Sequence, residues 1–296
     1  MSDASLAPVR IDAATQMGPV HYTAANLERQ IAFYRDRLGF QLLRRDGDTA
    51  ALGAGTRELV RLTEVRDARP ARRTTGLYHT AFLVPSRWEL AQLVRRIAET
   101  RTPIQGHSNH HTHLAFYLPD AEGNGIELAW DFPREAWPMR DGHLYPDGME
   151  RAGVDIDDLF LELERDPSPW AGLSAETTVG HVHLHTATLD TAQDFYQNIL
   201  GFDTTLRSES FAAVFVSAGG YHHHLGLNVW NGVGAPPAPP GSIGLRYFTI
   251  TLPTAAALQA VTERLDRAGI AMAETAEGLG VTDPAGIGVR LTTASA

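Results

Sequence analysis

Histidine side chains are the residues of this sequence whose type and spacing point most directly to chemistry. The chain has 13 histidines among 296 residues, and most of them fall in GHSNHHTH at 106–113, GHVHLH at 180–185 and YHHH at 221–224. Imidazole binds transition metals and transfers protons near neutral pH. A triple histidine can also be a surface tract that scavenges metal. A single strand histidine is more often structural, and we interpret His183 and His185 in that way.

Composition excludes several kinds of site and partner. The chain has no cysteine, which rules out disulfides, thiolate metal sites and cysteine nucleophiles and is typical of a cytoplasmic protein. Its formal net charge is −10, and it lacks the concentrated basic face that nucleic acid binding needs. No run reaches the roughly 18 apolar residues of a membrane span, and no secretion signal is visible. We therefore expect a cytoplasmic protein that acts on neither nucleic acid nor membrane.

The histidine segments belong to a unit that recurs along the chain. FYRDRLGF at 33–40 recurs as FYQNILGF at 195–202, each time after an alternating segment. GLYHTAFLVP at 76–85 resembles GLRYFTITLP at 244–253, and DAEGNGIEL resembles DPAGIGVRL. The matches indicate four copies of one supersecondary unit. The four units span 17–70, 76–131, 179–231 and 243–293.

Each unit shows the same order of expected elements. A short alternating strand comes first, because a period of two is the strand signature. An amphipathic helix follows, with Leu27, Ile31 and Tyr34 on one face in the first unit. Ser86 and Thr254 stand where helix N-caps would be. A glycine ends the helix and more strands follow. The sequence therefore predicts an α+β fold made of four βαβββ modules.

Two connections divide the chain. The longer one, 132–178, begins with a Pro-rich stretch and holds an acidic segment at 155–163 that predicts a short helix. The other, 231–242, is too rich in proline and glycine for regular structure. The expected parts are an N-terminal extension at 1–16, a first domain at 17–131, a linker at 132–178 and a second domain at 179–293.

Three motifs in this framework resemble those of a known family. GHVHLH at 180–185, SAGGYHHHLGLNVW at 217–230 and GNGIE at 123–127 resemble two-domain proteins like catechol 2,3-dioxygenase. With the repeated module, they resemble the vicinal-oxygen-chelate superfamily, which includes glyoxalases, bleomycin-resistance proteins and extradiol dioxygenases. The resemblance covers essentially the whole chain. It implies that modules pair into two cup-shaped domains of mixed β-sheet, with metal ligands on their first and last strands.

The resemblance also implies where metal ligands should stand. The corresponding positions are held, in chain order, by Pro19, His79, Glu127, His181, Tyr247 and Arg290. Pairing each unit with its sequence neighbour leaves neither pair with a full set. Pairing unit two with unit three unites His79, Glu127 and His181. We therefore expect one metal site, shared by units two and three, and a vacant cup in units one and four.

Two imidazoles and one carboxylate occupy one face of an octahedral ion, as in non-heme Fe(II) oxygenases. With Fe(II) or Mn(II), the open positions would accept the two oxygens of a catechol and O2. The resemblance therefore implies an extradiol dioxygenase, an oxidoreductase of aromatic hydrocarbon catabolism. Such an enzyme opens the ring next to its vicinal hydroxyls.

The same resemblance assigns roles around the metal. His223 matches the acid/base residue, which suits an imidazole whose ordinary pKa is near neutrality. Tyr117 matches a tyrosine that hydrogen-bonds the substrate oxygen. Both His107 and His110 fall near the family histidine that stabilises the oxygen adduct, and we prefer His110. Three histidines of these motifs are expected to bind substrate: His107, His222 and His224.

The sequence departs from the family pattern at two places. Ala121 replaces a usual proline in the turn before Glu127. Thr112 and His113 stand where this branch more often has small and acidic residues. We expect these departures to affect substrate preference more than mechanism.

Other functions share this fold. A hydroquinone-cleaving dioxygenase would use the same three ligands, whereas a glyoxalase-type lyase or isomerase should have a fourth protein ligand. A drug-binding protein would need no metal, and the three retained ligands argue against it. The expected partner is a small aromatic diol. An exposed sheet edge would favour assembly of identical chains.

Overall fold

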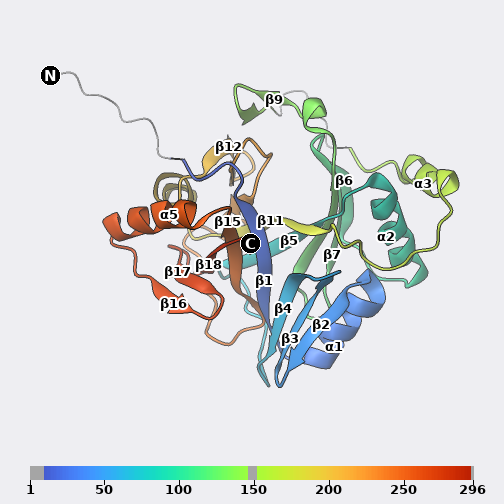
Figure 1. Ribbon diagram of the computed structural model, residues 1–296, viewed down its shortest axis with the longest axis horizontal. Helices are drawn as coiled ribbons and strands as arrows, with labels where there is room; N and C mark the ends of the chain where they lie inside the picture. Colours follow the sequence, from blue (N-terminus) through green and yellow to red (C-terminus); the bar gives the residue numbers. More distant parts are fainter. Residues whose placement is uncertain (1–9, 146–151, 295–296) are drawn as a thin grey trace.

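Most strands of the protein belong to two large mixed sheets (Figure 1). The computed structural model describes residues 10–145 and 152–294, so residues 1–9 of the expected N-terminal extension lie outside it. The first sheet contains, in spatial order, β16 (Ala273–Thr275), β17 (Gly278–Thr282), β18 (Gly288–Thr293), β15 (Gly244–Leu252), β1 (Gln16–Ala24), β4 (Arg57–Glu64), β3 (Thr49–Ala54) and β2 (Gln41–Asp46). The second contains β12 (Asp203–Ser208), β13 (Ala213–Ser217), β14 (Leu225–Asn228), β11 (Thr178–His185), β5 (Gly76–Leu83), β8 (Gly125–Asp131), β7 (His113–Pro119) and β6 (Gly106–Asn109).

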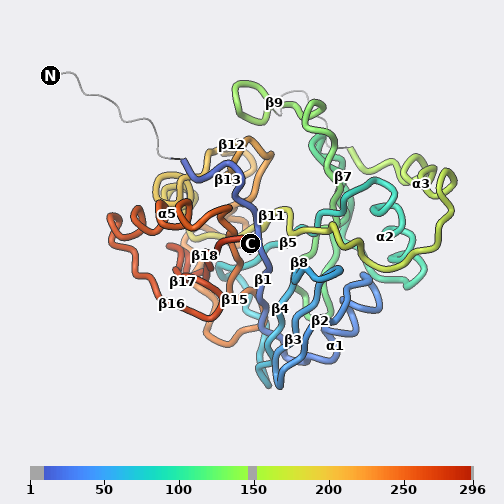
Figure 2. Tube along the Cα trace, viewed as in Figure 1, coloured from blue at the N-terminus to red at the C-terminus, as the bar shows by residue number. Residues whose placement is uncertain are grey.

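The two sheets combine units that are not all neighbours in sequence. In the first sheet, β1 of unit one pairs antiparallel with β15 of unit four. In the second, β5 of unit two pairs antiparallel with β11 of unit three. Figure 2 shows the result, with the blue β1 segment beside the orange-red β15 segment. The strand order confirms the predicted pairing of units two and three, and the α+β fold of βαβββ modules. The proposed domain limits at 131 and 179 stay a prediction.

Helices flank the sheets where amphipathic segments were expected. They are α1 (Leu27–Ala32), α2 (Arg87–Glu99), α3 (Ile156–Arg165), α4 (Leu189–Gln193) and α5 (Ala255–Arg267). The side chains of Ser86 and Thr254 accept hydrogen bonds from the third residue of α2 and α5, as N-caps do. α3 is the short helix predicted in the linker. The same linker also contains a 3₁₀ turn at Arg134–Ala136 and the strand pair β9 (Met139–Arg140) and β10 (His143–Leu144), which were not predicted.

The helices of units one and three differ from the regular helices expected there. Each ends in a wider π-helical turn, at Phe33–Arg37 and at Asp194–Ile199. Each turn buries a tyrosine that donates a hydrogen bond to a buried carboxylate of the following unit. The Tyr34 hydroxyl lies 3.3 Å from Asp120 Oδ2, and the Tyr196 hydroxyl lies 2.8 Å from the equivalent oxygen of Asp283. The repeated FY and turn motifs therefore lock sequence neighbours together across the two sheets.

A continuous hydrophobic core runs through both sheets. At its centre, Phe40 after the first helix packs edge-on against Phe82 of β5, with ring centroids 5.1 Å apart. Tyr22 of β1 donates a hydrogen bond of 2.6 Å to Thr80 of β5. These contacts fix the strands that carry the histidines. Among the described residues, no helix is long and apolar enough to cross a membrane.

Candidate metal centre

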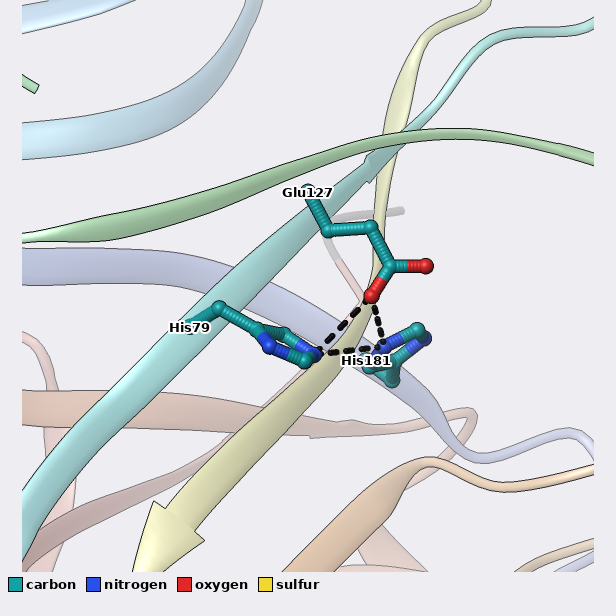
Figure 3. Close-up of side chains that lie close together, drawn as sticks. All are labelled: His79, Glu127 and His181. Carbon is teal, nitrogen blue, oxygen red and sulfur yellow. Dashed lines mark hydrogen bonds and ion pairs between the residues drawn. The ribbon is translucent and has the colours of Figure 1, made fainter. Parts of the chain in front are cut away.

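Three side chains with metal-binding groups converge on adjacent strands of the second sheet (Figure 3). His79 lies on β5, Glu127 on β8 and His181 on β11, with β5 in the middle. Ala81 of β5 pairs with Glu127 on one side and with His181 on the other. Paired residues point to one face of a sheet, and so do residues two apart on a strand. All three side chains therefore emerge on one face, and the small Ala81 leaves room for them to meet.

The spacing of the three ligand atoms fits a single ion. His79 Nε2 and His181 Nε2 are 3.2 Å apart, and Glu127 Oε2 lies 3.0 Å from the first and 3.3 Å from the second. Ligands about 2.1 Å from one ion lie about 3.0 Å apart at neighbouring corners of an octahedron and about 3.4 Å apart in a tetrahedron. The observed edges span this range. All three side chains are buried, which shields the group from bulk water.

The protonation states of the group also suit a divalent ion. Burial lowers the pKa of His181, which keeps its imidazole neutral at neutral pH. Burial alone would raise the pKa of Glu127, but the adjacent His181 and His79 hold it well below its ordinary value. A neutral imidazole and an ionised carboxylate are the forms that bind metal. Glu127 and His181 can therefore bind an ion without first losing protons.

His113 is a further member of the site that the sequence analysis did not assign a role. Its Nε2 lies 3.0 Å from Glu127 Oε1, the carboxylate oxygen that faces away from the two histidine ligands. Its Nδ1 is 2.8 Å from the Thr112 hydroxyl. Such contacts orient a ligand carboxylate. The signal was present as a departure from the family motif, but only the strand pairing shows what the residue touches.

The structure separates His107 and His110, the two histidines of GHSNHH that were considered for the oxygen-stabilising role. His110 Nε2 lies 2.7 Å from the hydroxyl of Tyr117, and Tyr117 pairs with Glu127 across β7 and β8. His107 instead accepts a hydrogen bond of 2.9 Å from the Val154 amide and belongs to neither of the metal-ligand groups that the described residues form. His110 therefore contacts Tyr117, as the resemblance implies, whereas His107 holds the linker through Val154.

From the sequence, the three consecutive histidines are expected on the last strand of unit three. In the structure they lie just before that strand, β14. β14 begins at Leu225. The last of the three histidines joins it to its neighbours: the His224 amide donates to the Val216 carbonyl, and the His224 carbonyl accepts from the Val182 amide. The His223 ring faces the His181 ring, with centroids 4.1 Å apart. The His224 ring accepts a hydrogen bond from the Ala218 amide. Of the three, His223 is thus the one packed directly against a ligand of the group.

A second group of metal-binding side chains lies beside the first: His113, Asp131 and His222. The two imidazole rings are stacked, 4.8 Å apart and tilted by only 13°. Lone pairs in two parallel rings do not converge on one point between them. We therefore interpret this group as hydrogen-bonded support, with His222 Nε2 3.1 Å from Asp131 Oδ1.

The corresponding end of the first sheet holds no such group among the residues described. The positions equivalent to the metal ligands are occupied here by Tyr247 and Arg290. The Arg290 guanidinium lies over the Tyr247 ring, 4.3 Å from its centroid, and the His21 ring meets the Tyr247 ring edge-on with centroids 4.8 Å apart. Arg61 is paired with Glu277 at 2.9 Å. The two metal-type groups found in the described part of the chain both lie in the second sheet. The cup expected to be vacant thus contains cationic and aromatic side chains.

Gly226 in the HHHLGLN motif makes room for a histidine beside the site. It pairs with His183, and a Cβ at this position would lie 2.7 Å from Cγ of the His183 ring. Gly226→Ala should lower the free energy of unfolding by about 1–3 kcal/mol, because an overpacked core must shift. Guanidinium unfolding of the single variant and of the double variant with His183→Ala checks this. The steric explanation would be contradicted if Gly226→Ala left the free energy of unfolding unchanged. It would also be contradicted if adding His183→Ala restored none of the lost stability.

The buried histidines predict that acid destabilises the fold. Burial is the main cause that lowers the pKa of His21 and His224 from 6.5 to about 3, and that of His222 to about 4. In the unfolded chain these side chains regain their ordinary pKa, so the unfolded state binds more protons below it. Stability should therefore be complete above the ordinary pKa and fall as the pH decreases toward the folded-state values, by about 1.4 kcal/mol per pH unit for each histidine. Urea unfolding with chelator present at several pH values tests this, and stability that stays constant on acidification would contradict it.

Comparison with known proteins places this fold in a family. The model of the Glyoxalase/Bleomycin resistance protein/Dioxygenase superfamily matches residues 16–128 and 178–291. A catechol-2,3-dioxygenase from Bacillus subtilis (strain 168) is 42% identical over 276 residues, which cover 91% of this chain and 94% of that protein. The chain therefore belongs to the glyoxalase/bleomycin resistance/dioxygenase superfamily, as its motifs had indicated.

Solved structures show the same fold at low sequence identity. A candidate dioxygenase from Bacillus subtilis superposes with a TM-score of 0.64 at 12% identity, covering 96% of this chain and 86% of that one. Glyoxalase I from Zea mays superposes with a TM-score of 0.57 at 17% identity, covering 94% and 92%. Because both dioxygenase-like and glyoxalase structures match, the fold alone does not select the reaction.

Proposed function

We propose that this protein is an extradiol dioxygenase that opens the ring of a catechol-type diol with O2, using one Fe(II) or Mn(II) ion held by His79, Glu127 and His181. The observation that carries the proposal is the convergence of these three ligand atoms at 3.0–3.3 Å on adjacent strands. The relative named catechol-2,3-dioxygenase supports the reaction class.

The proposed reaction needs both an open coordination face and a way to move protons. Bound at the three ligands, the ion would supply the positions at which the diol and O2 meet, and a path for electrons between them. The protein supplies the rest. His113 fixes the outer oxygen of Glu127, so that Oε2 stays directed at the two imidazoles. The buried walls exclude bulk water from the group.

Proton transfer falls to side chains around the ligand group. We assign His223 as the acid/base, since burial and adjacent histidines hold its pKa well below the ordinary value and leave it neutral, ready to accept a substrate proton. Tyr117 and His110 form a hydrogen-bonded pair. The Tyr117 ring lies beside the His79 ring, with centroids 5.5 Å apart. We assign Tyr117 to hydrogen-bond a substrate oxygen, and His110 to stabilise the negative charge that would develop where O2 reacts. The products then contain both atoms of O2 in one open-chain molecule.

The test is anaerobic loading with Fe(II) or Mn(II), followed by catechol and air. We expect oxygen uptake equal to the catechol consumed and a yellow ring-opened product. No turnover of catechol but turnover of a hydroquinone would move the proposal to the related ring-opening reaction. Turnover of only the glutathione adduct of methylglyoxal would favour a glyoxalase, and failure to bind either metal would favour a metal-free binding protein.

A further inference from the structure

Asp131, His222 and His223 form a buried chain of hydrogen bonds that ends beside the ligand group. Asp131 Oδ1 lies 3.1 Å from His222 Nε2, and His222 Nδ1 lies 2.8 Å from His223 Nδ1. The far end of the chain is the His223 ring, which packs between His181 and Phe215 at 4.1 and 4.8 Å. Asp131 closes β8, four residues beyond Glu127.

The order of donors and acceptors in this chain has one favourable solution. A neutral imidazole has one N–H and one bare nitrogen. Asp131 is ionised: burial would raise its pKa, but the hydrogen bond to His222 holds it below the ordinary value. An ionised carboxylate can only accept, so His222 must donate from Nε2. Burial lowers the pKa of His222 to about 4, so at neutral pH its ring carries one hydrogen and Nδ1 is bare. This nitrogen accepts, and the hydrogen between the two rings must come from His223 Nδ1.

The consequence appears at the other nitrogen of His223. With its hydrogen on Nδ1, a neutral His223 has a bare Nε2. Within residues 10–145 and 152–294, this nitrogen makes no hydrogen bond to another protein atom. The reverse arrangement would place the bare His222 Nε2 against the carboxylate, with two lone pairs 3.1 Å apart in a buried site.

The surroundings leave His222 little freedom to turn away from this arrangement. Its ring is buried, stacks on His113 at 4.8 Å and meets Trp137 edge-on at 5.0 Å. A ring flip would remove the bond to Asp131 and the bond to His223 together. The tautomer of His223 is thus set through His222 by Asp131, a carboxylate that lies outside the ligand group.

We propose that Asp131 is a positioning residue that, through His222, keeps the hydrogen of His223 on Nδ1 and leaves Nε2 free to accept the substrate proton. The structural half of this inference concerns hydrogen positions alone. Its kinetic half rests on the proposed function.

The decisive experiment is ¹⁵N NMR of histidine-labelled protein loaded with diamagnetic Zn(II). Comparison with His223→Gln assigns the His223 signals. In the wild type we expect His223 to show a protonated Nδ1 and a bare Nε2. In Asp131→Leu we expect a mixture of tautomers or the reverse one, whereas Asp157→Leu, at an exposed aspartate of α3, should leave the signals unchanged. Wild-type His223 with its hydrogen on Nε2 would overturn the proposal without any variant.

Kinetics on the iron- or manganese-loaded protein form the second arm. Asp131→Leu should lower kcat for catechol about tenfold to hundredfold, part of the usual contribution of an acid/base residue, with KM and metal content nearly unchanged. If Asp131→Leu alters the tautomer of His223 but leaves kcat unchanged, the link from Asp131 to the reaction is overturned. If the wild type turns over no catechol, the proposed function fails, while the NMR result still decides the tautomer.

Discussion

Glu127→Gln should abolish ring cleavage and leave the protein with little bound metal. The change keeps the shape of the side chain but replaces a buried anionic ligand with a neutral amide. The ligand group would then offer no negative charge to a divalent ion in a buried site. We expect metal affinity to fall by more than the ten- to hundredfold typical of losing an outer-shell partner. Equilibrium dialysis with metal analysis measures the affinity, and oxygen uptake measures the reaction.

A matched control exists in the first sheet. Glu277 pairs with Arg61 at 2.9 Å and is far from any ligand role in this account. Glu277→Gln should retain one metal ion per chain and full turnover. Metal binding that survives in Glu127→Gln but is lost in Glu277→Gln would place the ion in the other sheet.

His223→Leu should have the second largest effect, of a different kind. We expect kcat to fall about 10²- to 10⁴-fold, the usual contribution of an acid/base residue, while metal content stays at one ion per chain. The side chain packs against the His181 ring but is not one of the three converging ligands. Stopped-flow absorbance of anaerobic enzyme and catechol should still show binding.

The control for this variant is His143→Leu, at an exposed histidine of β10. It should leave kcat, KM and metal content unaltered. Loss of metal in His223→Leu would mean that the residue supports the ligands rather than the proton transfer. Unchanged kcat would show that another group is the acid/base.

The fold could be predicted from sequence because its information is local and repeated. Alternation, amphipathic helices and N-caps such as Ser86 and Thr254 appear within a few residues, and four copies reinforce one another. The widened turns at Phe33–Arg37 and Asp194–Ile199 could not be predicted in this way. They accompany hydrogen bonds from buried tyrosines to carboxylates about ninety residues along the chain, at sequence separations of 86 and 87.

The ligand group was predictable for a related reason. His79, Glu127 and His181 occupy equivalent positions of a repeated module, and only one pairing of modules unites them. The supporting residues have no such signal. His113 looked like a departure from a motif, and Asp131 looked like an ordinary strand end. Their roles depend on partners in other strands and loops: Glu127 across the β7–β8 pair, and His222 from unit three.

The most direct test of this account is a crystal structure of the Mn(II)-loaded protein with anomalous diffraction data. We predict one anomalous peak per chain, bonded to His79 Nε2, His181 Nε2 and Glu127 Oε2, with no peak near His21 and Tyr247 in the first sheet. A peak in the first sheet instead, or none at the three ligands under conditions that support catechol turnover, would contradict the claim that units two and three build a single catalytic metal site.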